Sequence, residues 1–363
     1  MPQPVVILTD RTGTELGPLD DASVNQVIWN LNDVGTAEIA VPTLSATGRY
    51  IELMKTEFQI WINGNLKWWG FPETVRGDSG LMTYECVDLL GYFKYRFITN
   101  TSLVFPPTGT TGVDQISIME QVVAQMQAGT YQSFNISGAG VSPSGVVRLR
   151  DYDISAHQNA LDILKEFPTL NNGCDFSVEC ADSFGNPARI FTPWFPSKGS
   201  FKPNYPLEWG KNILTFNQFQ EDGTKLCTLN YTTGGTDSTG TKVENHYEDT
   251  AASQYYGQFQ AISTDAAELD PAWLLSLAIQ TVENRNKPFA SPTYVTVAAD
   301  GTDLIDNLSV GDTVPVFVDC GRIQIPGDTY RIMQATYKGD GTYSLMMGRT
   351  PAAFVYPPPG PVL

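Results

Sequence analysis

The sequence is poor in charged residues, and in basic residues above all. Only 17% of its 363 residues are charged, and 39 acidic against 22 basic side chains give a formal net charge of −17. An average domain is about 25% charged. A protein that grips nucleic acid needs a basic face that displaces counterions from phosphates. The charge balance therefore argues against specific nucleic-acid binding and against docking on anionic lipid.

Long apolar runs are missing as well. No stretch approaches the 18 or more consecutive apolar residues of a membrane helix, and the opening residues MPQPVVILTDRTG lack a signal-peptide pattern. We therefore expect no stable membrane insertion and a chain that is made in a cytoplasm. Hydrophobic residues nevertheless make up 42% of the chain and aromatic residues 11%. This content is high enough to build a packed core, which excludes a disordered protein.

Residues that carry chemistry are scarce. Two histidines, His157 and His246, are few for acid–base or metal work, and the stretch Asn245–Asp249 is interpreted as a solvated loop. Metal motifs, nucleophile elbows and phosphate-binding loops are all absent from the sequence. We therefore predict no cofactor, no metal and no enzymatic activity. The five cysteines form no CxxC pair and are predicted to be buried free thiols: Cys86, Cys174, Cys180, Cys227 and Cys320.

The first 98 residues are predicted to form a compact antiparallel β domain, small enough to be a barrel or a sandwich. Short β-rich runs alternate with turn residues, and Asn63-Gly64 between FQIWI and LKWWGF is typical of a tight hairpin. The predicted strands are VVILTD, VNQVIWNLN, TAEIAVP, FQIWI, LKWWGF and LMTYECVD.

Residues 99–206 are predicted to form an inserted α+β region. Asp114 is suited to cap a helix whose inner face carries Met119, Val122, Val123 and Met126 and which Gly129 ends. A second helix is expected from about Ile154 to Phe167, with Ala160, Leu161 and Leu164 inward and Pro168 as its stop. CDFSVEC and ARIFTPWF are predicted strands.

Residues 207–350 return to β patterning and are predicted to form a second β-rich domain, for which the resemblance described below implies a β-barrel. One helix interrupts it at about 270–287, with Asp270 as cap, Pro271 in its first turn and Pro288 at its end. The segment TTGGTDSTGT is expected to be a loop, and residues 351–363 a Pro-rich tail. The predicted fold class is thus α+β and β-dominated.

An internal echo links the two β-rich stretches. Arg76-Gly77-Asp78-Ser79-Gly80 matches Lys338-Gly339-Asp340-Gly341, and each segment lies between an incoming and an outgoing strand. Gly-Asp-Gly is a common hairpin turn, so the match by itself leaves both duplication and coincidence open. We take the two turns as the candidate functional positions: Gly77, Asp78, Gly80, Gly339, Asp340 and Gly341.

The order of these features resembles the minor tail or baseplate-hub proteins of long-tailed bacteriophages, and most closely those of siphophages that infect actinobacteria. The resemblance runs from Val5 to about Gly348. It is carried by VVILTDRTGTELGPLDDASVNQVIWNLNDVGTAEIAVP, FQIWINGNLKWWGFPETV, CVDLLGYFKYRFI, NALDILKEFPTLNNGCDFSV, LEWGKNILTFNQFQEDGTKLCTLNYTTGG, YYGQFQ and LSVGDTVPVFV…YRIMQATYKGDGTYSLMMG.

The resemblance implies a structural protein at the tip of a phage tail, assembled in the host cytoplasm. It implies a homotrimer in which each chain supplies two barrels related to the tail-tube fold, so that three chains form a pseudo-sixfold ring on a hexameric tube. The implied partners are the distal tail protein, the tail tube, the tape-measure protein and other tip or fibre proteins. The two candidate turns would face the tube, and the channel-facing surface is expected to be neutral to acidic.

Two alternatives stay open. A carbohydrate-binding adhesin would use exposed aromatic side chains, for which Trp68, Trp69, Trp194 and Trp209 are the candidates. A wall-degrading glycosidase would use a pair of carboxylates. With 39 acidic residues some pair always lies at a workable separation, and no sequence motif singles one out.

Overall fold

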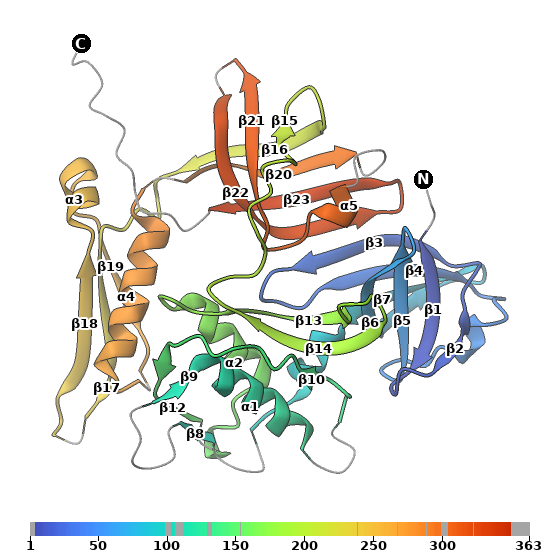
Figure 1. Ribbon diagram of the computed structural model, residues 1–363, viewed down its shortest axis with the longest axis horizontal. Coiled ribbons are helices and arrows are strands. Elements are labelled where there is room, and N and C mark those ends of the chain that lie inside the picture. The colour runs from blue at the N-terminus through green and yellow to red at the C-terminus, as the bar shows by residue number, and fades with distance from the viewer. Residues whose placement is uncertain are drawn as a thin grey trace.

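The computed structural model describes residues 4–98, 103–105, 112–128, 133–152, 154–237, 239–266, 268–287, 289–298, 304–321 and 323–349. Strands dominate these residues, and thirteen of them join into one large, mostly antiparallel sheet. Figure 1 shows this sheet across the upper and right parts of the molecule, with a mixed region below it and a separate layer to the left. The predicted α+β, β-dominated class is confirmed. Gly129 and Pro288, the predicted ends of two helices, and the predicted Pro-rich tail lie outside the described residues.

The first half of the sheet comes from residues 4–98, which we call the first half. The turn between β5 and β6 is formed by Asn63 and Gly64 at φ 54° and 77°, as their sequence predicts. The elements are β1 (Val5–Asp10), β2 (Glu15–Pro18), β3 (Ser23–Asn30), β4 (Thr36–Pro42), η1 (Gly48–Tyr50), β5 (Thr56–Ile62), β6 (Asn65–Gly77), β7 (Leu81–Asp88) and η2 (Leu89–Tyr95).

The middle region follows, within residues 99–206. A β-hairpin and two helices form most of its body. Its elements are β8 (Leu103–Phe105), β9 (Val113–Asp114), α1 (Gln115–Gln127), β10 (Ser137–Gly138), β11 (Val147–Arg148), β12 (Arg150–Tyr152), η3 (Ile154–Ala156), α2 (Ala160–Glu166), η4 (Phe167–Thr169), β13 (Asp175–Ala181) and β14 (Pro187–Trp194).

The two helices of the middle region differ in how well the sequence predicts them. For α1 the prediction is confirmed, because the Asp114 carboxylate accepts the Ile116 N–H and the four named apolar residues are buried. The second helix is shorter than expected. His157 adopts φ 46°, and Asn159 caps α2 by accepting the N–H groups of Leu161 and Asp162. The left-handed residue and the cap together end the first helical turn before α2 begins.

The second half of the sheet is formed by residues 207–222 and 289–349, which we call the second half. Its elements are β15 (Leu207–Glu208), β16 (Ile213–Asp222), β20 (Phe289–Ala298), α5 (Leu304–Asn307), β21 (Thr313–Cys320), β22 (Ile323–Lys338) and β23 (Thr342–Arg349).

Residues 223–287 form a unit of their own between β16 and β20, which we call the side unit. Its elements are β17 (Leu229–Thr236), β18 (Lys242–Glu248), α3 (Thr250–Tyr256), β19 (Gln260–Thr264) and α4 (Pro271–Arg285). The strands form a separate sheet in the order β18-β17-β19, against which α4 packs (Figure 1). The predicted cap of α4 is confirmed, since Asp270 accepts the Ala272 N–H.

Two loop predictions in the side unit are wrong. Asn245–Glu248, interpreted as a solvated loop, belongs to β18, and the first five residues of TTGGTDSTGT belong to β17. In both cases tertiary pairing within the side-unit sheet places polar residues in strands. No helix among the described residues is long and apolar enough to cross a membrane.

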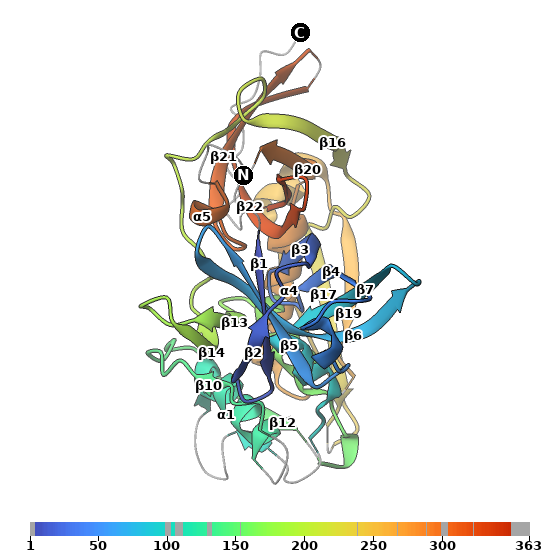
Figure 2. The same cartoon turned by 90° about the vertical axis from the view of Figure 1, so that its right-hand side faces the viewer.

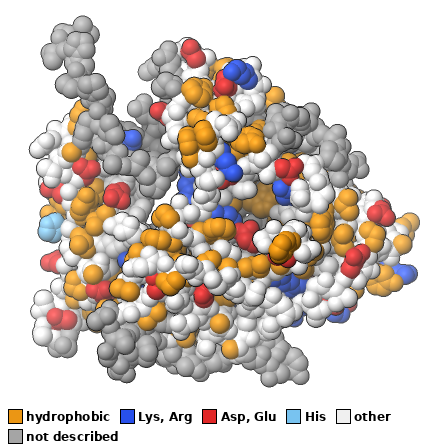
Figure 3. All heavy atoms as spheres, in the orientation of Figure 1, with side chains coloured by type: hydrophobic (Ala, Val, Ile, Leu, Met, Phe, Trp, Pro, Cys, Tyr) orange, Lys and Arg blue, Asp and Glu red, His pale blue; other side chains and the backbone are white. Residues whose placement is uncertain are grey.

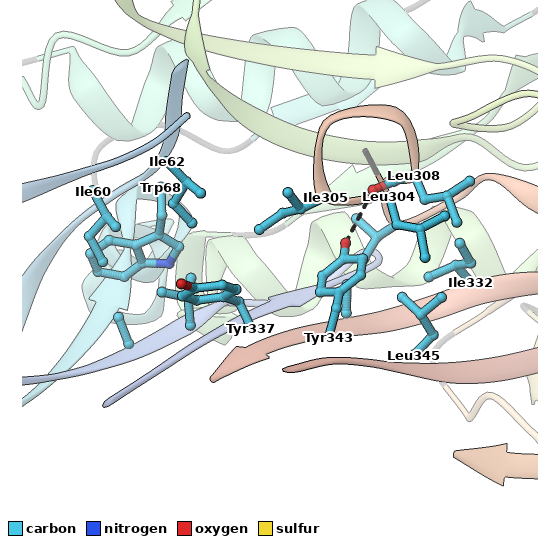
Figure 4. Packing of buried hydrophobic residues seen from close by; sticks show 14 of the residues in the cluster. Ile60, Ile62, Trp68, Leu304, Ile305, Leu308, Ile332, Tyr337, Tyr343 and Leu345 are labelled. Atoms are coloured by element: carbon cyan, nitrogen blue, oxygen red, sulfur yellow. Dashed lines mark hydrogen bonds between the residues drawn. The ribbon is translucent and has the colours of Figure 1, made fainter. Parts of the chain in front are cut away.

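Two apolar cores lie in the molecule. The first is shared by both halves of the large sheet, and the second is built by the middle region together with β6, β7 and η2. In Figure 4, Tyr337 of the second half lies close to Ile60 and Trp68 of the first half. The thiol prediction holds in part: all five cysteines are free, but Cys180 and Cys320 are only partly buried.

Candidate functional site

The two halves of the large sheet share one strand order. In the first half the order is β3-β4-β7-β6-β5, and in the second half it is β16-β20-β23-β22-β21. All of these neighbours pair antiparallel. The turns singled out in the sequence join β6 to β7 and β22 to β23, so they occupy the same place in each half. The strand order therefore indicates a structural duplication.

Two β-bulges fix the correspondence residue by residue. One interrupts the register at Lys67 in β5–β6 and at Gly327 in β21–β22. The other lies at Glu73 in β6–β7 and at Met333 in β22–β23. Both show the same shift of 260 positions (67 to 327 and 73 to 333). Bulges are specific structural features, so β6 and β22 are equivalent strands with a known alignment.

This alignment corrects the one that the sequence echo suggests. The echo matches Arg76 with Lys338, whereas the bulges match Arg76 with Thr336. The hairpin connections also differ in length: the last ladder pairs are Gly77 with Met82 and Tyr337 with Tyr343, so the second connection is one residue longer. The Gly-Asp-Gly motifs are therefore similar turns at slightly different positions.

The first turn is held by its aspartate. The Asp78 carboxylate accepts the N–H groups of Gly80 at 2.8 Å and Leu81 at 3.1 Å, and these bonds lower the pKa of Asp78. Gly77 has no room for a side chain, since a Cβ there would lie 2.4 Å from the Leu81 carbonyl oxygen. The turn is braced from β4, because the Thr43 N–H donates to the Gly80 carbonyl.

The second turn uses similar chemistry against a different neighbour. The Asp340 carboxylate accepts the Thr342 N–H at 2.9 Å and the Thr342 hydroxyl at 2.7 Å, which lowers the pKa of Asp340. Gly341 adopts φ 81°, a conformation that favours glycine. The Gly339 N–H donates to the Asn25 carbonyl at 2.9 Å, so this turn rests on β3 of the first half.

A direct strand joint connects the two halves. β22 pairs antiparallel with β3 from Gln334–Asn30 to Lys338–Gln26. The Gln334 amide also donates to the Asn30 side chain at 2.8 Å. Because β22, β4 and β6 are each separated by one antiparallel strand, they run in the same direction. Both candidate turns therefore project from the same end of one continuous sheet, on strands that are four strand spacings, or about 19 Å, apart. Figure 2 shows the β6–β7 hairpin extending beyond the body.

One face of this continuous sheet is polar. A single register row crosses five strands through Lys338, Gln26, Glu38, Glu85 and Thr74. The opposite face packs into the shared core.

Arg76 lies on this polar face and pairs with both acids of the row. Its guanidinium lies 3.0 Å from Glu85 and 3.5 Å from Glu38. Within this row and Arg76, two acidic and two basic residues balance, so these positions carry no net charge.

Buried ion pairs fasten the middle region to both halves, and no sequence pattern points to them. Arg189 of β14 pairs with Glu57 of β5 at 2.5 Å, with both side chains almost fully buried. Burial raises the pKa of Glu57 to about 6, although Arg189, Tyr92 and Trp69 all oppose the shift. Arg331 of β22 pairs with Asp175 of β13. The pairing residues are more than 130 positions apart, which is why sequence spacing could not reveal them.

A small cavity of about 190 Å³ lies where the three parts meet. Trp29 of the first half and Tyr343 of the second half line it together with Cys180 of the middle region. Ion pairs border it, Lys67 with Asp306 at 2.8 Å and Lys198 with Glu179 at 2.8 Å. Figure 3 shows a hollow with basic side chains around it on this face. The lysine charges that border the cavity are therefore already paired with carboxylates.

The aromatic residues proposed for sugar stacking are mostly unavailable. Trp68 and Trp69 are 2% and 4% exposed and belong to the two cores. Trp194 is half-buried and donates to the Ser177 hydroxyl, and Trp209 is 41% exposed. The hypothesis of an adhesin therefore loses two of its four residues, because strand alternation places those rings inside.

Neither a protein-family profile nor a curated protein matches this chain. Solved structures do match. The prophage tail protein gp18 of Listeria monocytogenes EGD-e has a TM-score of 0.59 at 12% identity, over 96% of this chain and 95% of that one.

Two further structures agree over almost the whole chain. The 43 kDa tail protein of prophage MuSo2 from Shewanella oneidensis has a TM-score of 0.61 at 12% identity, over 96% of this chain and 98% of that one. A tail protein of Neisseria meningitidis MC58 has a TM-score of 0.60 at 15% identity, over 96% of this chain and 97% of that one.

The chain has the fold of phage tail proteins. Each match covers 96% of this chain and at least 95% of the other chain, so the two halves, the middle region and the side unit all belong to that fold.

Proposed function

We propose that this chain is a structural virion protein that forms a trimeric hub at the tip of a phage tail. The observation that carries the proposal is the duplicated strand frame within a phage tail fold. Two equivalent halves per chain give six equivalent units in a trimer, which matches the symmetry of a hexameric tube. The partners would be the tail tube and distal tail protein on one side, other tip or fibre proteins on the other, and the tape-measure protein inside. The specific link to actinobacterial siphophages remains a prediction.

The candidate turns fit a docking role in this ring. Both project from one end of the continuous sheet, and hydrogen bonds accepted by the carboxylates of Asp78 and Asp340 fix their shapes. A ring of six such turns would present a repeated surface to the end of a tube. We propose that this end of the sheet faces the tube.

The polar face of the sheet is the proposed channel wall. Its described rows combine Glu38 and Glu85 with Arg76 and Lys338, so they form no continuous basic track. A basic wall would hold DNA phosphates through counterion release, whereas a neutral one lets the polymer slide. Replacing both Glu38 and Glu85 by lysine in the assembled phage should slow DNA ejection without changing the number of tails.

The role is tested on purified virions. Antibody-gold labelling against this chain should mark one tip of each tail, and mass spectrometry should find three copies per virion. Label distributed along the tail, or absent from tails, would contradict the hub. The proposed role is not enzymatic, and clearing of host peptidoglycan by the purified protein would overturn that part.

A further inference from the structure

We propose that neighbouring copies of this chain join by strand pairing between β6 of one copy and β16 of the next, in the register of the β22–β3 joint. This inference rests on the proposed ring and specifies how the ring closes. The duplication indicates that the partner of the β6 edge is a second copy of this chain, because β22 is equivalent to β6 and β3 is equivalent to β16. A joint made once inside the chain can thus be repeated between chains.

Both strands needed for the repeat have an open edge. Among the described residues β16 forms a ladder only with β20, and its first residue, Ile213, makes a single bridge with Trp209. β6 pairs with β5 no further than Gly70, and the Met54 N–H occupies the Pro72 carbonyl. From Glu73 to Gly77 the edge away from β7 has no ladder partner in the described chain. Unpaired strand edges are templates for another strand.

Burial at equivalent positions shows which edge is covered and which is open. In the joint inside the chain, Ala335, Thr336 and Tyr337 are 1%, 8% and 4% exposed. At the equivalent positions of β6, Val75 is half-buried and Gly77 is exposed, and the Arg76 side chain is 65% exposed. The same strand segment is thus covered in the second half and uncovered in the first.

The alignment gives the expected register. β3 and β16 pair with equivalent positions of β4 and β20, which equates Asn30 with Glu221. The pair Gln334–Asn30 inside the chain corresponds to Thr74 of one copy opposite Glu221 of the next. In the same way, Thr336–Ile28 corresponds to Arg76 opposite Phe219. Arg76 is thereby placed diagonally from Glu221, an arrangement in which opposite charges attract.

The bonding pattern identifies which pairs suit a disulfide. The Gly339 N–H donates to Asn25 and the Leu31 N–H to Met333, so the odd-numbered residues of β3 form the hydrogen-bonded pairs. Asn30 and Gln334 are therefore a non-hydrogen-bonded pair, whose Cα atoms lie about 4.5 Å apart. This separation is within disulfide range. The equivalent pair between copies is Thr74 with Glu221.

The test is cysteine cross-linking of the full chain under mild oxidation. Thr74→Cys combined with Glu221→Cys should give covalent dimers and trimers that a reductant reverses. Asn30→Cys combined with Gln334→Cys is the matched control inside the chain, and should lose its two added free thiols while staying the size of one chain. Thr74→Cys combined with Gln220→Cys is the off-register control, since a one-residue slip points the side chain to the other face. The unmodified chain is the control for cross-linking through its five native thiols.

The outcomes separate this joint from the hub itself. Light scattering at the mass of three chains, with cross-linking at least ten-fold above the off-register control, supports the joint. A trimer without cross-links, or with equal cross-linking in both double variants, overturns the joint and leaves the hub standing. A chain that remains a monomer at about 100 µM and does not cross-link contradicts both.

Discussion

Both halves of the large sheet hold the middle region by a buried ion pair, but at one pair of equivalent positions in β6 and β22 they contact it by different means. Phe71 and Arg331 are equivalent under the 260-position shift (71 to 331). Phe71 is fully buried and stacks on Tyr92 at 4.1 Å, which in turn stacks on Phe134 of the middle region at 4.0 Å. Arg331 instead pairs with Asp175 of the middle region. A strand frame therefore fixes where a contact lies, while the side chain decides its chemistry.

The difference predicts different sensitivities. An apolar contact loses burial and leaves a cavity when its side chain is shortened, and salt hardly affects it. A buried ion pair that loses one partner leaves an uncompensated charge. Three variants test this contrast and a fourth compares the two equivalent strand edges, from the largest expected effect to the smallest.

Phe71→Ala should lower the free energy of unfolding by about 4 kcal/mol, because it empties a fully buried site in the aromatic stack. Urea denaturation followed by tryptophan fluorescence measures the change. Phe71→Leu keeps most of the volume and should cost less than half as much. Equal losses for both variants would show that the stack, and not the burial, carries the contact.

Arg331→Met should lower the free energy of unfolding by about 3 kcal/mol, because Asp175 would remain buried without its cation. The Asn32 amide also donates to Asp175 at 2.6 Å, so Asn32→Ala serves as a milder control at about 1 kcal/mol. Raising the salt concentration should leave the loss for Arg331→Met unchanged. A loss that disappears in high salt would place the pair in solvent.

Glu57 gives the pH dependence of the contact in the first half. Its pKa is raised from 4.5 to about 6 by burial, so the folded state binds the proton more tightly than the unfolded state. The stability from this group is present below pH 4.5 and lost as the pH rises through 6. Relative to Glu57→Gln, the parent chain should therefore gain about 2 kcal/mol between pH 7.5 and pH 4.5. Urea titrations of both proteins at the two pH values measure it, and an opposite trend would refute the shift.

Arg76→Ala should change the stability of a single chain by less than about 0.5 kcal/mol, because its pairs with Glu38 and Glu85 are solvent-exposed. Its equivalent Thr336 lies inside the joint, and Thr336→Arg should be far more destabilising. Differential scanning calorimetry on the two variants gives the comparison. Similar values would mean that the two edges are not different in exposure.

Much of the local structure could be predicted from the sequence, because it depends on neighbouring residues. Asp114 and Asp270 cap their helices, and Asn63-Gly64 makes its turn, through groups within a few positions. The two candidate turns were located for the same reason, since Gly-Asp-Gly is local turn chemistry. His157 marks the limit: nothing in its neighbourhood shows that it adopts φ 46° and shortens the second helix.

The sequence by itself determined the helix caps and the positions of the two turns, since hydrogen-bonding partners nearby in the chain decide these. The tertiary structure alone decided that Trp68 and Trp69 lie inside, that Asn245 belongs to a strand, and that Arg331 meets a carboxylate 156 residues away. Burial and charge pairing depend on which distant segments pack together. The register of β22 on β3, and with it the open edge of β6, follows from that packing and from no pattern in the sequence.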